Sequence, residues 1–265
     1  MFRWCSYCQS FLGETAPFDD YQLTHGMCGD CEIALGAHPG TGLPESTLIA
    51  KQLMELLFSV FENGDSLDCQ HLVQEARQAG ISRAEIMLGL LQPALYEIGE
   101  RWKSAKISPS QEDLFTSWCK RIYFLITMDT LPTEKPDILL ATMPGNMHTL
   151  GINFLKVFLH DHGFSCKVID APPTSQSIVH VCIQDQIKLC GISVCLTGGV
   201  PSAIRLAEEI ERQTKEKTRV VLGGFAFRME EGSPKLRIPT FALLENFTDY
   251  VETLMKGKEQ HNDRC

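Results

Sequence analysis

The sequence predicts an α/β protein whose main domain is a doubly wound parallel sheet, preceded by a four-helix bundle and a small cysteine module. Three observations predict it. Strands and helices alternate over residues 136–256, apolar residues recur with helical period over 44–131, and two close cysteine pairs occur within 1–42. The 265 residues, of which 44% are apolar, suffice for these cores. Residues 257–265 are expected to form a tail.

The alternating segment predicts four buried strands, at 137–142, 165–170, 188–196 and 219–222. Helices are expected between and after them, at 149–162, 175–186, 201–213 and 246–255. In a sheet of this kind, ligands bind beyond the carboxyl ends of the strands. The loops after Thr142, Leu196 and Leu222 are therefore the expected binding region.

The preceding segment predicts four helices joined by short turns, which favours an antiparallel bundle. They are expected at 45–62, 65–79, 83–102 and from Ser108 or Ser110 to about 131. Ser82 and Glu85 have the spacing of a capping box. Pro93 is expected to bend the third helix, because proline removes a backbone donor and clashes with the preceding turn.

The charge and cysteine usage exclude several classes of protein. A net charge of −9 disfavours general nucleic-acid binding, which needs a basic face. The sequence contains no run of 18 apolar residues, so we expect no membrane span. It has no apolar segment near Met1, so we expect no signal peptide. Eleven cysteines, an odd number, without such a signal favour a reducing cytoplasm.

Four cysteines near the N-terminus predict a zinc site. Cys5 and Cys8 form one pair, Cys28 and Cys31 the other, and 19 residues separate the pairs. Four thiolates around Zn²⁺ would fold a segment too small for its own core. A redox or iron–sulfur site is the alternative. Residues 1–45 carry one basic and six acidic side chains, a charge of −5, so we expect a protein-docking module and not a DNA reader.

The loops of the sheet domain carry a spaced motif. Asn146, His148 and Gly151 follow the first strand, and 41 residues later Ser193 and Cys195 end the third. Gly223-Gly224 follows the fourth strand. With the bundle before it, this arrangement resembles the cobalamin-binding domain family, whose fold is Rossmann-like (flavodoxin-like).

The resemblance implies a role for each motif residue. His148 would be the lower axial ligand to cobalt, since neutral imidazole is a good ligand. The cofactor's own base would lie buried beside the sheet, hydrogen-bonded to Ser193 with Cys195 nearby. Gly151 and the pair Gly223-Gly224 would allow close approach of the backbone.

Asn146 departs from the family, which has a carboxylate two residues before the histidine. A carboxylate raises the basicity of the ligand and fixes its tautomer. An amide can orient the ring but contributes no charge. This difference bears on methyl-transfer cycling.

The bundle resembles a subgroup of the family, cobalamin-dependent light sensors. Nine residues separate Trp102 from Glu112, the spacing at which that subgroup covers a 5′-deoxyadenosyl upper ligand. Two positions differ: Asp113 replaces a histidine after the glutamate, and Lys103 replaces a histidine that takes the upper coordination site. The alternatives are a core aromatic for Trp102 and a first-turn acid for Glu112.

These residues predict a sensor or regulator that binds cobalamin, preferably adenosylcobalamin, with light as one candidate signal. Two alternatives remain: a corrinoid carrier of a methyltransferase system, and a haem sensor of the same fold with His148 as ligand. We assign no catalytic residues and do not expect an enzyme in its own right. A protein partner is expected, direct DNA binding and a membrane are not, and a homo-oligomer is left open.

Overall fold

The computed structural model describes residues 1–5, 11–28, 45–128, 135–169, 172–227, 237–241 and 244–262. The chain divides into two compact units, residues 1–132 and 133–265. Among the described residues, no helix is both long and apolar enough to cross a membrane.

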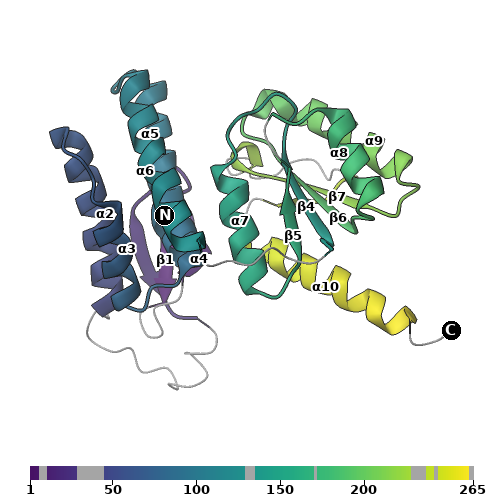
Figure 1. Ribbon diagram of the computed structural model, residues 1–265, viewed down its shortest axis with the longest axis horizontal. Coiled ribbons are helices and arrows are strands. Elements are labelled where there is room, and N and C mark those ends of the chain that lie inside the picture. The colour runs from purple at the N-terminus through teal and green to yellow at the C-terminus, as the bar shows by residue number, and fades with distance from the viewer. Residues whose placement is uncertain are drawn as a thin grey trace. The chain divides into compact units, whose positions relative to one another are not determined.

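The second unit contains a five-stranded sheet of order β5-β4-β6-β7-β8, in which every pairing is parallel (Figure 1). Its strands are β4 (Ile138–Thr142), β5 (Cys166–Val168), β6 (Leu189–Ser193), β7 (Arg219–Gly223) and β8 (Thr240–Phe241). The sequence predicted the first four. It missed β8, because two residues are too short to show a period.

Helices cover both faces of this sheet (Figure 1). On one face α8 (Ser175–Gln184) and α9 (Val200–Gln213) pack against alternate strand residues such as Leu139 and Ile192. On the other face α7 (Leu150–Asp161) and α10 (Leu244–Asn262) pack against Ile138, Leu140 and Val221. The doubly wound fold class is thereby confirmed, because successive strand residues point into opposite helical layers.

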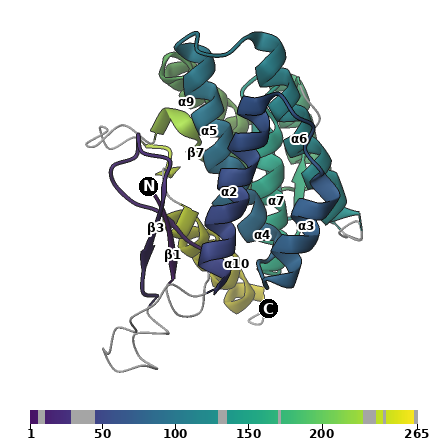
Figure 2. The ribbon, with the colours of Figure 1, turned by 90° about the vertical axis from the view of Figure 1, so that its left-hand side faces the viewer.

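The first unit contains a helical bundle (Figure 2). Its elements are α2 (Glu45–Asn63), α3 (Cys69–Gln78), α4 (Arg83–Glu85), η1 (Ile86–Leu91), α5 (Gln92–Lys103) and α6 (Pro109–Thr127). Ser82 and Ser108 both form capping boxes. The second helix begins at Cys69, later than predicted, because the Asp68 side chain accepts from the backbone N–H groups of Gln70 and His71.

The third predicted helix contains a π-helical segment where only a bend at Pro93 was expected. Residues Ile86–Leu91 are all buried and form η1, and the Gln92 N–H donates to the Met87 carbonyl five residues back. Pro93 cannot donate to the Gly89 carbonyl, so the wider turn lies directly before the proline.

A small sheet of order β2-β1-β3 precedes the bundle in the same unit. Its strands are β1 (Phe2–Cys5), β2 (Phe11–Glu14) and β3 (Leu23–Gly26), and the sequence did not predict them. The sheet packs on the bundle. The Phe11 N–H donates to Glu85 Oε1 at 3.0 Å, and a Cβ added to Gly89 would lie 2.3 Å from Trp4 Cζ2. The fully buried Trp4 ring therefore rests on the backbone of η1.

Candidate cofactor site

The carboxyl ends of three neighbouring strands form the candidate site. Thr142 is paired in register with Ser193, and Ser193 with Gly223. The loops that follow β4, β6 and β7 therefore start from adjacent positions at one edge of the sheet. This register brings together the predicted residues of all three loops.

The loop after β4 presents His148. The Thr142 hydroxyl donates to the Asn146 carbonyl at 3.0 Å, and the Asn146 N–H donates to the Met143 carbonyl at 2.9 Å. Gly145 supplies the positive φ of +79° that this turn needs. The His148 side chain is exposed, and none of the described residues forms a hydrogen bond with its ring. Its imidazole is thus available to a ligand or metal.

Asn146 contacts the backbone of His148 and not its ring, which differs from the expectation that it orients the imidazole. Asn146 Oδ1 accepts from the His148 backbone N–H at 2.9 Å. Asn146 Nδ2 donates to Cys195 Sγ at 3.2 Å. The amide therefore joins the loop after β4 to the loop after β6.

The glycine pair after β7 is explained by contacts within the chain. Gly224 has φ +104°, and a Cβ there would lie 2.8 Å from the Val194 carbonyl oxygen and 3.0 Å from Ser193 Oγ. A Cβ at Gly223 would lie 3.2 Å from the Phe241 carbonyl oxygen. Gly151 differs, because a Cβ there would meet no heavy atom within 4 Å. The pair is therefore needed for contacts within the chain, and its close approach to a cofactor stays a prediction, whereas the space at Gly151 is open.

The site also exposes apolar side chains that the sequence analysis did not single out. Met147 is 63% exposed and Leu196 76% exposed, each on a loop that carries motif residues. From the sequence we expected Leu196 to end a buried strand, but β6 ends at Ser193 and Leu196 lies on the loop beyond it. The Ser193 hydroxyl forms no hydrogen bond within the described part of the chain. An exposed imidazole beside large apolar side chains fits a wide, flat cofactor with a metal that takes a nitrogen ligand.

The two residues predicted to cover the upper ligand lie on the bundle. Trp102, at the end of α5, is 53% exposed, which excludes the alternative of a core aromatic. Glu112 lies in the first turn of α6 and accepts from the Thr116 hydroxyl at 2.9 Å. The exposed indole leaves a flat apolar face free for contact.

Two of the four predicted zinc ligands are described. Cys5 ends β1, Cys28 follows β3, and the Cys28 N–H donates to Cys5 Sγ at 3.5 Å. Cys8 and Cys31 lie outside the described residues. The described ranges contain no group of three or more possible metal ligands.

The cysteines of the two cores are packing residues. Cys69, Cys119, Cys166, Cys182 and Cys190 are buried. Burial raises the pKa of the Cys166 thiol to about 12. A hydrogen bond with Cys182, together with burial, raises the pKa of the Cys190 thiol well above its usual range. Such thiols stay protonated and inert, as expected for free cysteines in apolar surroundings.

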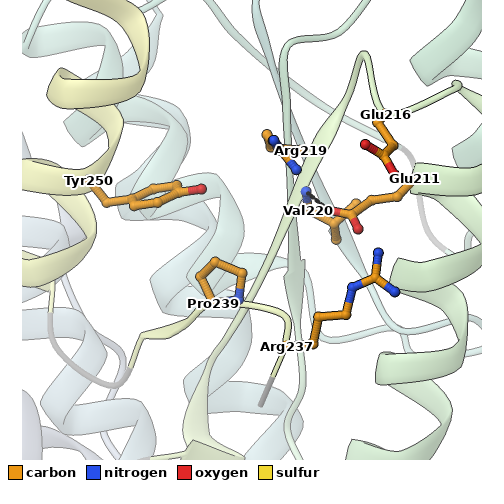
Figure 3. A pocket seen from close by; sticks show the side chains of 7 residues that line it. All are labelled: Glu211, Glu216, Arg219, Val220, Arg237, Pro239 and Tyr250. Atoms are coloured by element: carbon orange, nitrogen blue, oxygen red, sulfur yellow. Dashed lines mark hydrogen bonds between the residues drawn. The ribbon is translucent and has the colours of Figure 1, made fainter. Parts of the chain in front are cut away.

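Two hollows in the structure are lined by other residues than those of the predicted site. One, of about 300 Å³, is at the amino ends of β7 and β8, the edge of the sheet opposite the motif loops (Figure 3). Glu211 of α9 lines it and accepts from the Val220 N–H at 3.4 Å. The other, of about 850 Å³, lies in the first unit between residues 19–23 and helices α2 and α5. Neither is lined by a predicted site residue.

Comparison with known proteins identifies two domains. Residues 136–233 match a B12 binding domain, and residues 53–124 match a second B12 binding domain family. The chain is 25% identical over 158 residues to an uncharacterised 20.5 kDa protein of the bchF-crtJ intergenic region of Rhodobacter capsulatus, covering 58% of this chain and 82% of that protein.

One of the solved structures that match this chain shares its fold. The monomethylamine corrinoid protein of Methanosarcina barkeri matches with a TM-score of 0.59 and 15% identity, over 72% of this chain and 92% of that one. A cobalamin-binding protein of Desulfitobacterium hafniense DCB-2 is 18% identical over 68% of this chain and 79% of its own, with a TM-score of only 0.32. The first of these supports the fold assignment.

Proposed function

We propose that this chain, which belongs to the B12 binding domain families over residues 53–124 and 136–233, is a cobalamin-binding regulatory protein with His148 as the lower axial ligand to cobalt. The observation that carries the proposal is the exposed His148 imidazole on the loop after β4, with Met147 and Leu196 exposed beside the same sheet edge. Bound cobalamin would supply a metal–ligand bond whose state can change.

The remaining motif residues receive supporting roles. The Ser193 hydroxyl would hydrogen-bond a buried part of the cofactor, and the space at Gly151 would admit it. Asn146 and Cys195 would hold the loop that carries His148. Gly223 and Gly224 would allow the close packing of the neighbouring strand ends. These roles agree with the structure, in which the Ser193 hydroxyl has no hydrogen bond within the described residues and Asn146 is hydrogen-bonded to Cys195.

The form of the cofactor is proposed to be adenosylcobalamin, with light as a candidate signal. The exposed Trp102 indole and the Glu112 carboxylate support it, because they suit an apolar face and ribose hydroxyls. Regulation would require a protein partner, since residues 1–45 are acidic and disfavour direct DNA contact.

A carrier of methyl groups is the second candidate. It is supported by the fold that this chain shares with the monomethylamine corrinoid protein of Methanosarcina barkeri. Carriers need no aromatic cover for an adenosyl group. The exposed Trp102 therefore favours the regulatory protein.

The test is an absorption spectrum of the full chain loaded with adenosylcobalamin in the dark and again after green light, for wild type and His148→Ala. A bound spectrum that depends on His148 and shifts with light supports the regulatory protein. Binding without a light response, together with methylation of the bound cofactor by a partner enzyme, transfers the assignment to the carrier. Failure to bind, or a haem-like Soret band in the isolated protein, refutes it.

We further propose a structural zinc ion at Cys5, Cys8, Cys28 and Cys31. The spacing supports it, and so does the N–H···S contact from Cys28 to Cys5, since thiolate ligands commonly accept backbone donors. Metal analysis should find about one zinc per chain, reduced by Cys28→Ser. Iron with acid-labile sulfide in its place would establish the iron–sulfur alternative.

A further inference from the structure

We infer that Asn146 and Cys195 form an uncharged clamp that positions His148 through the backbone of its loop, in place of a carboxylate acting on the imidazole ring. The inference rests on the proposed role of His148 as a metal ligand. It assigns Asn146 and Cys195 as positioning residues and explains why an amide occupies position 146.

An amide suits both contacts. Asn146 must accept from the His148 N–H, at 2.9 Å, and donate to Cys195 Sγ, at 3.2 Å. An ionised carboxylate only accepts, so aspartate would keep the first contact and could keep the second only with the Cys195 thiol, a weak donor, in the donating role. The reversed amide would set two donors against each other at His148, so the contacts themselves fix which atom is the oxygen.

The loops that carry Asn146 and Cys195 are each hydrogen-bonded to the ends of the neighbouring strands. The Thr142 hydroxyl donates to the Asn146 carbonyl, and the Met143 N–H donates to the Ser193 carbonyl at 3.2 Å. On the other loop, the Val194 N–H donates to the Gly223 carbonyl at 2.8 Å. The clamp therefore ties the loop of His148 to the centre of the sheet.

The clamp leaves the imidazole without a partner from Asn146. The two hydrogen bonds of the Asn146 side chain go to the His148 backbone and to Cys195, and neither goes to the imidazole ring. The direction of the His148 ring is then set by its anchored backbone and by the metal. Loosening the clamp should weaken metal contact by increasing the disorder of the loop, with no charge removed from the site.

The experiment is a mutant cycle of Asn146→Ala, Cys195→Ala and the double variant, read in two ways. Amide hydrogen exchange of His148 in the cofactor-free chain reports the clamp itself. The affinity for hydroxocobalamin reports its effect on binding. The EPR splitting of bound cob(II)alamin in ¹⁵N-histidine-labelled protein reports whether a histidine is the ligand, and loss of that splitting in His148→Ala identifies the histidine as His148.

Cys195→Ala removes one hydrogen bond and should speed His148 exchange and lower affinity by about fivefold, whereas Asn146→Ala removes two and should have the larger effect. The double variant should be no worse than Asn146→Ala, because Asn146→Ala already removes both contacts of the clamp. Asn146→Asp keeps the acceptor for the His148 N–H and loses the donor to Cys195, so it should resemble Cys195→Ala. Cys195→Ser keeps an acceptor and should restore most of what Cys195→Ala loses.

Additive losses, or an Asn146→Asp variant that binds more tightly than wild type, would overturn the clamp. The exchange measurement tests whether Asn146 and Cys195 hold the His148 loop even if the wild type binds no cobalamin. In that case the proposed function fails, and the clamp is judged by exchange alone. Unchanged exchange with a ¹⁵N-sensitive splitting would retain His148 as ligand and reject the clamp.

Discussion

Replacing Gly89 with alanine should destabilise the first unit, although alanine is the better helix former. The substitution would place a Cβ 2.3 Å from Trp4 Cζ2, and two further atoms of the same ring lie at 3.0 and 3.1 Å. Trp4 has no exposed surface. The ring cannot move away without shifting β1, which ends at Cys5.

The magnitude follows from two opposing effects. Alanine gains about 1 kcal/mol over glycine within a helix. Overpacking a closed core costs about 1–3 kcal/mol, and so close a contact with a buried ring belongs at the upper end. The free energy of unfolding should therefore fall by about 1–2 kcal/mol. Gly99→Ala is the matched control, because no atom lies within 4 Å of its added Cβ, and it should gain about 0.5–1 kcal/mol.

Urea unfolding followed by tryptophan fluorescence measures this effect in the full chain. The three tryptophans, Trp4, Trp102 and Trp118, all belong to the first unit, so their emission follows that unit alone. The two glycine variants should move the midpoint in opposite directions at unchanged slope. A gain of stability in Gly89→Ala equal to that in Gly99→Ala would refute the packing of Trp4 on η1.

Three further predictions concern other parts of the chain. Trp102→Ala should weaken adenosylcobalamin binding while changing the unfolding free energy of the cofactor-free chain by less than about 0.5 kcal/mol. Its control is Trp118→Ala, which removes a ring that is only 7% exposed and lies edge-on to Phe61. This variant should lower the free energy of unfolding, measured in urea, by about 3–5 kcal/mol. Asp68→Ala should lose about 1 kcal/mol in the same assay, since its side chain caps two backbone donors, and an unchanged midpoint would contradict that cap. Burial raises the pKa of Cys166 from 9.0 to about 12, so its contribution to stability is complete below pH 9 and is lost as pH rises towards 12. Cys166→Ala should therefore show a shallower loss of stability with pH above 9 than wild type, by up to about 1.4 kcal/mol per pH unit, and parallel curves would show that this thiol is not responsible.

Local signals predicted most of the helices and strands. The capping residues Ser82 and Ser108 begin helices where their spacing indicated, because a cap involves only the residues of one turn. The strands β4 and β6 follow from their continuous apolar runs. The small N-terminal sheet was not predictable in this way, because β1 pairs in parallel with β3 across the intervening residues and neither strand has a strong period of its own.

The π-helical turn shows why a pattern along the chain is not enough. The apolar period through Ile86–Leu91 suits an α-helix, and Pro93 indicated only a disturbance. Gly89 faces Trp4, which lies on a strand more than eighty residues earlier in the chain. The local sequence of neither segment predicts this contact.

The sequence by itself determined the α/β class, the loops expected to bind a ligand and the chemical nature of the candidate ligands, because strand period, helix caps and motif spacing are properties of neighbouring residues. Only the tertiary structure decided which of those loops meet and which side chains contact one another. Asn146 and Cys195 are 49 residues apart and come into contact because β4 lies beside β6 in the sheet. Such a pairing depends on strand order and register, and these depend on the packing of the whole sheet between its helices.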